Sequence, residues 1–256
     1  MDITEFTPEK IKKGLEKAKS RRDKQSENIK ILFSPQTINE ENFEEVCEAY
    51  SNLSANDYDT VVIVESHPGS AEKKLPMPSF KSVKTPLGEV FANDKLRNDF
   101  ADEDDDFFIN DEAFDEGVSL YNQLMMLQST LEDFDILSIQ ITDEGSFIVK
   151  ELAYALEEVL ASKNALMVFC CDLDSEHIEE FKRLEAFIDN WNMSTMMNYL
   201  NSGESSVNGL GALLTGLIVA EKWGLNIKFK SSMDPSGQNK NLITGFANVE
   251  RQLTYG

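Results

Sequence analysis

The chain has 256 residues, with 24 Lys and Arg against 46 Asp and Glu, which gives a formal net charge of −22. This excess of carboxylates disfavours a protein that binds nucleic acid through general electrostatics, because it repels phosphate groups. The hydrophobic fraction of 41% is sufficient for a buried core, and chains of about 250 residues commonly fold as one α/β domain. The chain contains two histidines, which limits any metal site built from imidazole ligands.

We expect no signal for export or membrane insertion from the sequence given. The first residues lack a basic region followed by an apolar stretch. The longest apolar stretch, residues 210–220, is shorter than the about 20 residues that cross a bilayer. Three cysteines, Cys47, Cys170 and Cys171, fit neither a disulfide framework nor a zinc motif. We therefore expect a soluble cytoplasmic protein with reduced thiols that binds neither membranes nor nucleic acid.

Residues 1–27 are expected to form a basic helical arm ahead of a domain that spans residues 28–256. Thr7 is a suitable N-cap, and Pro8 occupies the first helical position, where its missing N–H is harmless. Residues 1–30 hold nine basic and six acidic side chains. Two interpretations are open: a tail for an acidic partner, or an amphipathic helix against the acidic body of its own chain. The second is favoured because the nearest opposite charge is on the same molecule.

In the first half of the domain, a strand, a helix and a second strand are predicted in turn. Residues 29–33 and 61–64 are short apolar runs, and residues 43–53 between them show helical spacing. Residues 68–88 are rich in proline and glycine, which excludes a long helix there. The acidic run 102–106 lacks the alternating ligands and central glycine of a calcium-binding loop, so it is predicted to be a solvated loop. A helix is predicted over residues 120–131.

The second half repeats this alternation. The predicted strands and helices are, in order, strand 134–139, helix 149–160, strand 165–171, helices 176–185, 187–200 and 209–223, and strands 225–229 and 242–249. Cys170 and Cys171 are expected to face opposite sides of their strand, and Met193, Met196 and Met197 to fill the core. The whole pattern predicts a single α/β domain with a largely parallel or mixed central sheet flanked by helices.

Ligands of such sheets collect at the carboxyl ends of the strands. The polar residues at these positions are Gln36 after the first strand, His67 after the second, and Asp172 and Ser175 after the strand that ends in the cysteine pair. Asn208 precedes the long apolar helix. We expect these residues to share one crevice.

Several stretches in this order are similar to motifs of one known family. They are Pro35-Gln36 ahead of Ala49-Tyr50, Val64-Glu65-Ser66-His67-Pro68, Thr85-Pro86-Leu87-Gly88-Glu89, Ser119-Leu120 followed by Gln123-Leu124, Cys170-Cys171-Asp172-Leu173-Asp174-Ser175, Asn208-Gly209 and Gly245-Phe246-Ala247. The set resembles the MEMO family, also called AmmeMemoRadiSam system protein B. The resemblance covers about residues 28–250 and implies a fold related to class III extradiol dioxygenases.

The same resemblance implies where a metal is held in the family. A histidine of a Pro-His turn, a histidine after Pro-Ser and a cysteine before glycine correspond here to Gln36, His67 and Asn208. Further pocket histidines of the family correspond to Val118, Pro68 and Ser175. Neutral amides are weak ligands for iron, copper or zinc. The resemblance therefore predicts a vestigial pocket without a metal or other cofactor and without catalytic residues, formed by Gln36, His67, Val118, Asp172, Ser175 and Asn208.

The expected function is that of a non-catalytic MEMO-like protein that binds a small polar ligand or a protein partner. The alternative is a metal-dependent oxidoreductase or dioxygenase-like enzyme that uses His67, Asp172 and His177 as two histidines and a carboxylate. His177, however, is expected in the first turn of a helix, facing solvent. A purely structural role in an assembly is a third interpretation, and no sequence feature specifies an oligomeric state.

Overall fold

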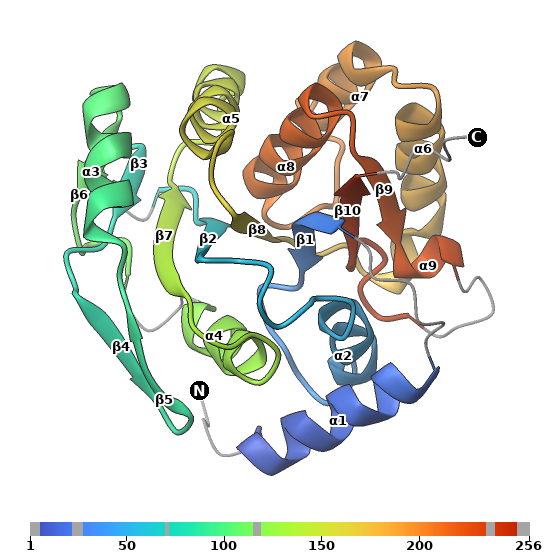
Figure 1. Cartoon of the computed structure of the whole chain (residues 1–256). Coiled ribbons are helices and arrows are strands. Elements are labelled where there is room, and N and C mark those ends of the chain that lie inside the picture. Colours follow the sequence, from blue (N-terminus) through green and yellow to red (C-terminus); the bar gives the residue numbers. More distant parts are fainter. Residues whose placement is uncertain (1–5, 22–27, 70–71, 115–118, 234–238, 250–256) are drawn as a thin grey trace, which may run out of the picture.

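A six-stranded mixed sheet forms the centre of the molecule (Figure 1). The computed structural model describes residues 6–21, 28–69, 72–114, 119–233 and 239–249. In the order β7-β2-β8-β1-β10-β9 the strands are β7 (Asp135–Ile141), β2 (Thr60–Ser66), β8 (Ala165–Cys170), β1 (Asn28–Ser34), β10 (Gly245–Val249) and β9 (Asn226–Phe229). The first four pair in parallel, and β10 runs antiparallel to both β1 and β9. The predicted fold class is confirmed, and the sheet is of the mixed kind.

Helices cover both faces of this sheet, as Figure 1 shows. One face packs against α3 (Asp94–Glu103), α5 (Ser146–Leu160), α6 (Ile178–Asp189), α7 (Met193–Leu200) and α8 (Leu210–Lys222). The other packs against α1 (Pro8–Arg21), α2 (Phe43–Tyr50) and α4 (Leu120–Gln128). Two apolar cores therefore lie on the two sides of the sheet.

Alternation along the strands separates these two cores. In β2, Val62 and Val64 belong to the core on the α5 and α8 side, whereas Val61 and Ile63 belong to the core on the α2 and α4 side. This follows from the two-residue period of a strand, which explains why both faces of a central strand must be apolar. Cys170 and Cys171 likewise contribute to different cores, which confirms the prediction for the cysteine pair.

The stretch between β2 and α4 contains elements that the sequence patterns did not predict. It forms two small two-stranded sheets, β3 (Leu75–Met77) with β6 (Phe107–Ile109) and β4 (Ser82–Thr85) with β5 (Gly88–Phe91), as well as α3. The α3 helix begins because the Asn93 side chain accepts a hydrogen bond from the backbone N–H of Leu96, 2.7 Å away. Since α3 extends to Glu103, the prediction of a solvated loop over residues 102–106 is wrong for its first two residues.

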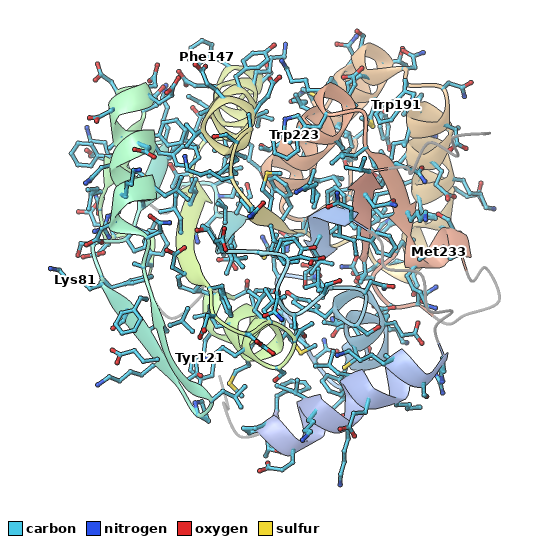
Figure 2. All side chains as sticks on the ribbon, viewed as in Figure 1. Lys81, Tyr121, Phe147, Trp191, Trp223 and Met233 are labelled. Atoms are coloured by element: carbon cyan, nitrogen blue, oxygen red, sulfur yellow. The ribbon has the colours of Figure 1, made fainter. Side chains whose placement is uncertain are left out.

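The boundary between α6 and α7 also differs from the predicted one. The chain turns at Trp191, which has a positive φ of 47° and lies at the surface (Figure 2), several residues beyond the predicted break. Met196 and Met197 are buried in the core on the α8 side, as predicted. The remaining short helices are η1 (Ser175–His177) and α9 (Lys230–Met233).

The basic helix α1 lies along α2 (Figure 1). Its buried residues are Ile11, Leu15 and Ala18, and Gly14 allows close approach, because a Cβ there would lie 2.6 Å from the Cys47 Sγ. Its basic side chains form ion pairs with carboxylates of the same chain, including Lys17 with Glu44 at 2.9 Å. The helix therefore packs on its own domain, as the amphipathic interpretation expected. No helix within the described residues is long and apolar enough to cross a membrane.

Candidate functional site

The loops at the carboxyl ends of β1, β2 and β8 meet at one edge of the sheet, because these strands are parallel. The loop before α8 joins them through Asn208. The backbone N–H groups of Asp172 and Asn208 each donate to the other residue's carbonyl oxygen at 2.9 Å. The strand-end crevice expected from the sequence is therefore formed by segments that lie far apart in the chain.

Gln36 connects three of these loops. Its side-chain Oε1 accepts a hydrogen bond from Asn208 Nδ2 at 2.9 Å, and its Nε2 donates to the Ser66 carbonyl oxygen at 3.1 Å. Its backbone N–H donates to Asp172 Oδ2 at 3.1 Å. Gln36, Asp172 and Asn208, which the sequence placed in one pocket, are thus in direct contact.

Gly209 makes this contact sterically feasible. The residue has a φ of 73°, in the left-handed region that favours glycine. A Cβ at this position would lie 2.7 Å from the Cys170 carbonyl oxygen and 3.0 Å from Gln36 Nε2. The Asn208-Gly209 pair therefore requires glycine at its second position, both for the turn into α8 and for the approach to β8.

A remote carboxylate caps the start of α8. The backbone N–H of Gly211, in the first turn of that helix, donates to Glu144 Oε1 at 2.7 Å, and the Ser66 hydroxyl donates to the same oxygen at 2.5 Å. A negative charge at this end of a helix is stabilising, because unpaired N–H groups and the helix dipole point toward it. Glu144 thereby fixes α8 to the end of β2, and the sequence patterns gave no indication of it.

His67 lies beside a buried carboxylate, Glu65, which is part of the motif similar to the family but was not among the residues predicted for the pocket. Its Nε2 is 3.5 Å from Glu65 Oε2, and Glu65 is fully buried at the end of β2. The Glu65 carboxylate also accepts hydrogen bonds from the Ser119 backbone N–H at 3.0 Å and from Gln140 Nε2 at 2.9 Å. These two donors satisfy the buried carboxyl group and hold it beside the imidazole. A carboxylate directly after the apolar run 61–64 was the available signal.

A second buried network lies beneath the crevice. Gln123 of α4 accepts hydrogen bonds from the Ser34 hydroxyl at 3.0 Å and from the Tyr50 hydroxyl, and its Nε2 donates to the Pro35 carbonyl oxygen at 2.8 Å. One side chain therefore ties the end of β1 to α2 and α4. It supports the turn that presents Gln36.

An open cleft of about 550 Å³ borders the crevice. Three of the predicted pocket residues, Asp172, Ser175 and Asn208, line it, whereas Gln36 and His67 are not among its lining residues. The remaining wall is polar and includes Asn42 and Asn241. Val118, the sixth residue predicted for the pocket, lies outside the described residues.

The carboxyl group of Asp172, in this cleft wall, has a raised pKa. Burial raises its pKa to about 6, an effect that the Gln36 N–H opposes and the nearby Asp174 carboxylate reinforces. A carboxyl group with such a pKa takes up and releases protons close to neutral pH. Asp172 can therefore accept a hydrogen bond from a ligand in one form and donate one in the other.

The potential ligand atoms of His67, Asp172 and His177 do not form a group within 4.8 Å of one another. His177 ends η1, and its Nε2 lies 3.3 Å from the exposed Glu176. Among the described residues, one set of three potential ligand atoms lies within 4.8 Å, and its members are Asp104, Asp106 and Glu151, remote in the sequence from the crevice. Burial and the two neighbouring aspartates raise the pKa of Glu151 to about 7.

The fold and the crevice define a mixed α/β protein whose polar site lies at the carboxyl edge of its sheet. The family model described as Memo-like protein matches residues 5–238. The chain therefore belongs to the Memo-like protein family, and its fold is consistent with the dioxygenase-like fold that the resemblance implied. The match begins at residue 5 and so includes α1. A comparison with curated proteins finds no match.

Proposed function

We propose that this Memo-like protein binds a small polar ligand at the crevice and its adjoining cleft, without a transition metal and without catalysis. The observation that carries the proposal is the direct hydrogen bond between Gln36 and Asn208, at two of the positions that the resemblance assigns to metal ligands. This hydrogen bond holds the two side chains together, so they need no bridging ion.

The chemistry of the donor set supports this proposal. Iron, copper and zinc favour imidazole, thiolate and carboxylate ligands, and the two amides offer only carbonyl oxygens. The Gln36 oxygen already accepts the Asn208 amide. His67 supplies one imidazole, beside Glu65. These residues therefore fit a first-row transition metal poorly.

The cleft offers suitable groups for a polar ligand. Asp172 presents a carboxyl group that is fixed by the Gln36 backbone N–H, and Asn208 adds an amide on the same wall. Carboxylates and amides together recognise ligands that carry amine, amide or hydroxyl groups. A compound of this kind fits a volume of about 550 Å³.

One binding experiment with two kinds of probe tests the proposal. Iron(II), copper(II) and zinc(II) are titrated by calorimetry into the wild type and into the double variant Gln36→His with Asn208→Cys. The wild type is expected to bind none of them stoichiometrically after dialysis, whereas the variant regains three strong ligands with His67 and binds at least one. The second probe is a panel of amino acids, polyols and polyamines, of which at least one should bind the wild type.

Two control variants locate the expected binding. Adding His67→Ala to the double variant should abolish the regained metal binding, and Asp172→Ala should abolish binding of the panel compound. Stoichiometric metal in the wild type that is lost on His67→Ala would contradict the metal-free proposal. A panel in which no compound binds would contradict the ligand-binding proposal for these chemical classes.

A further inference from the structure

The carboxylate of Glu45 holds two consecutive backbone N–H groups from a distant part of the chain. Glu45 lies in the first turn of α2 and is 7% exposed. Its Oε2 accepts the Lys240 N–H at 3.0 Å, and its Oε1 accepts the Asn241 N–H at 2.8 Å. Successive backbone N–H groups that point at one anion form a small anion-binding concavity. Glu45 thereby attaches residues 240–242 to α2.

Asn241 extends this attachment to the cleft. Its Oδ1 accepts the Leu173 N–H at 2.9 Å, and its Nδ2 donates to the Cys171 carbonyl oxygen at 3.0 Å. The same Nδ2 lies 3.5 Å from Asp172 Oδ1, and the Leu242 N–H donates to the Leu173 carbonyl oxygen at 2.8 Å. Asn241 therefore holds the two residues that flank Asp172, namely Cys171 and Leu173. Glu45 in turn holds the backbone N–H of Asn241.

We propose that Glu45 is a positioning residue for the cleft: as a carboxylate it holds residues 240–242 against Asp172, and when protonated it releases one of the two backbone N–H groups. A carboxylate offers two acceptor oxygens, whereas a protonated carboxyl group keeps one good acceptor and gains a donor. Lys240 and Asn241 line the cleft, so the cleft wall loosens on protonation. This inference rests on the proposed function in that it takes the cleft as the ligand site.

The surroundings of Glu45 place this change near neutral pH. Burial raises the pKa of Glu45 to about 7, and the N–H groups of Asn241 and Lys240 oppose that rise. Glu48, one turn further along α2, raises it as well, while Lys230 of α9 lowers it and is itself paired with Glu48. The Lys240 side chain lies 4.0 Å from Glu41. We therefore expect the wall to be held above about pH 7 and loosened below it.

Nuclear magnetic resonance of the ¹⁵N-labelled full chain tests this inference without any ligand. The backbone amide signals of Lys240 and Asn241 are followed between about pH 5.5 and 8.5, together with their hydrogen exchange. In the wild type we expect both signals to move with one shared midpoint near 7. Their exchange protection, corrected for the intrinsic pH dependence, should be about tenfold lower below that midpoint, as expected for loss of a hydrogen bond to a charged group.

Three variants test whether this titration midpoint belongs to Glu45. Glu45→Gln should abolish it, whereas Glu44→Gln should leave it unchanged, because Glu44 pairs with Lys17 and Arg21 on the exposed side of α2. Asp172→Asn removes the other acid of raised pKa that contacts Asn241, and the midpoint should remain.

Other results would overturn the inference. These are amide signals that do not titrate in the wild type, a midpoint that persists in Glu45→Gln, or one that disappears in Asp172→Asn. If Glu45→Gln does not fold, the inference is still tested by whether the amide signals titrate in the wild type and whether the midpoint remains in Asp172→Asn. Failure of the ligand panel would contradict the proposed function and leave this titration intact, so the two failures are distinguishable.

Discussion

Helices α8 and α1 are both attached to the sheet domain by buried apolar residues, but to different extents. In α8 the ten residues from Gly211 to Ala220 are all buried, and the helix begins at the Asn208-Gly209 turn of the crevice. In α1 three residues are buried, and the exposed side carries ion pairs with α2. Burial of apolar surface contributes about 25 cal/mol per Å², whereas an exposed ion pair contributes about 0–1 kcal/mol. The apolar core thus fixes α8 and the crevice at its start. The basic helix α1 lies at the margin of the domain and is held more weakly.

The same substitution on both helices is the strongest test of this difference. Leu214→Ala in α8 should lower the free energy of unfolding by about 2–5 kcal/mol, because the buried site cannot collapse around the missing atoms. Leu15→Ala in α1 should lower it by less than about 2 kcal/mol, because a peripheral helix can shift or open locally. Urea unfolding monitored by circular dichroism measures both values. Equal losses would show that α1 is as tightly integrated as α8.

Two glycines with positive φ, Gly203 and Gly209, allow a test of the close backbone approach at the crevice. Gly203 has a φ of 80° and nothing within 4 Å of a Cβ, whereas Gly209 has a similar φ and the Cys170 carbonyl oxygen 2.7 Å from a Cβ. Gly203→Ala should therefore destabilise by about 1 kcal/mol through backbone strain alone. Gly209→Ala should destabilise by about 2–4 kcal/mol, because it combines the strain with a steric clash. Thermal unfolding of both variants measures the difference, and similar shifts would argue against a close approach at Gly209.

The sheet and most of its helices could be predicted from the sequence, because the signal for each is local. β-Branched runs such as residues 61–64 and the helical spacing of residues 149–160 report burial directly. The α3 helix was missed because its signal, an Asn93 cap followed by Leu96 and Phe100, is short and lies beside a dense acidic run that suggested a loop. Trp191 in a positive-φ turn could not be predicted, because tertiary packing overrides the local preference there.

The crevice was predicted in part. Gln36, Asp172 and Asn208 could be brought together because strand ends of a parallel sheet converge and because the family motifs occur in order. Glu45, Asn241 and Glu144 were missed for a physical reason: each acts through contacts with backbone groups far along the chain, and no sequence pattern specifies such a partner. Burial of a polar side chain likewise cannot be predicted from the sequence, because it depends on hydrogen-bond partners that only the fold brings near.

Glu44→Gln should have the smallest effect and tests the α1 side of the comparison. The Glu44 carboxylate lies 2.9 Å from Lys17 Nζ and 2.5 Å from Arg21 Nη1, and hydrogen bonds from these two side chains lower its pKa. Its contribution is therefore present above the unfolded pKa of about 4.3 and lost as the pH falls through the lowered folded value. Because all three side chains are mostly exposed, the variant should lose about 0.5 kcal/mol at low ionic strength, and less in 1 M salt. Urea unfolding at both ionic strengths measures this difference; a loss above about 2 kcal/mol that persists in salt would mean that the ion pairs, rather than Ile11 and Leu15, hold α1 in place.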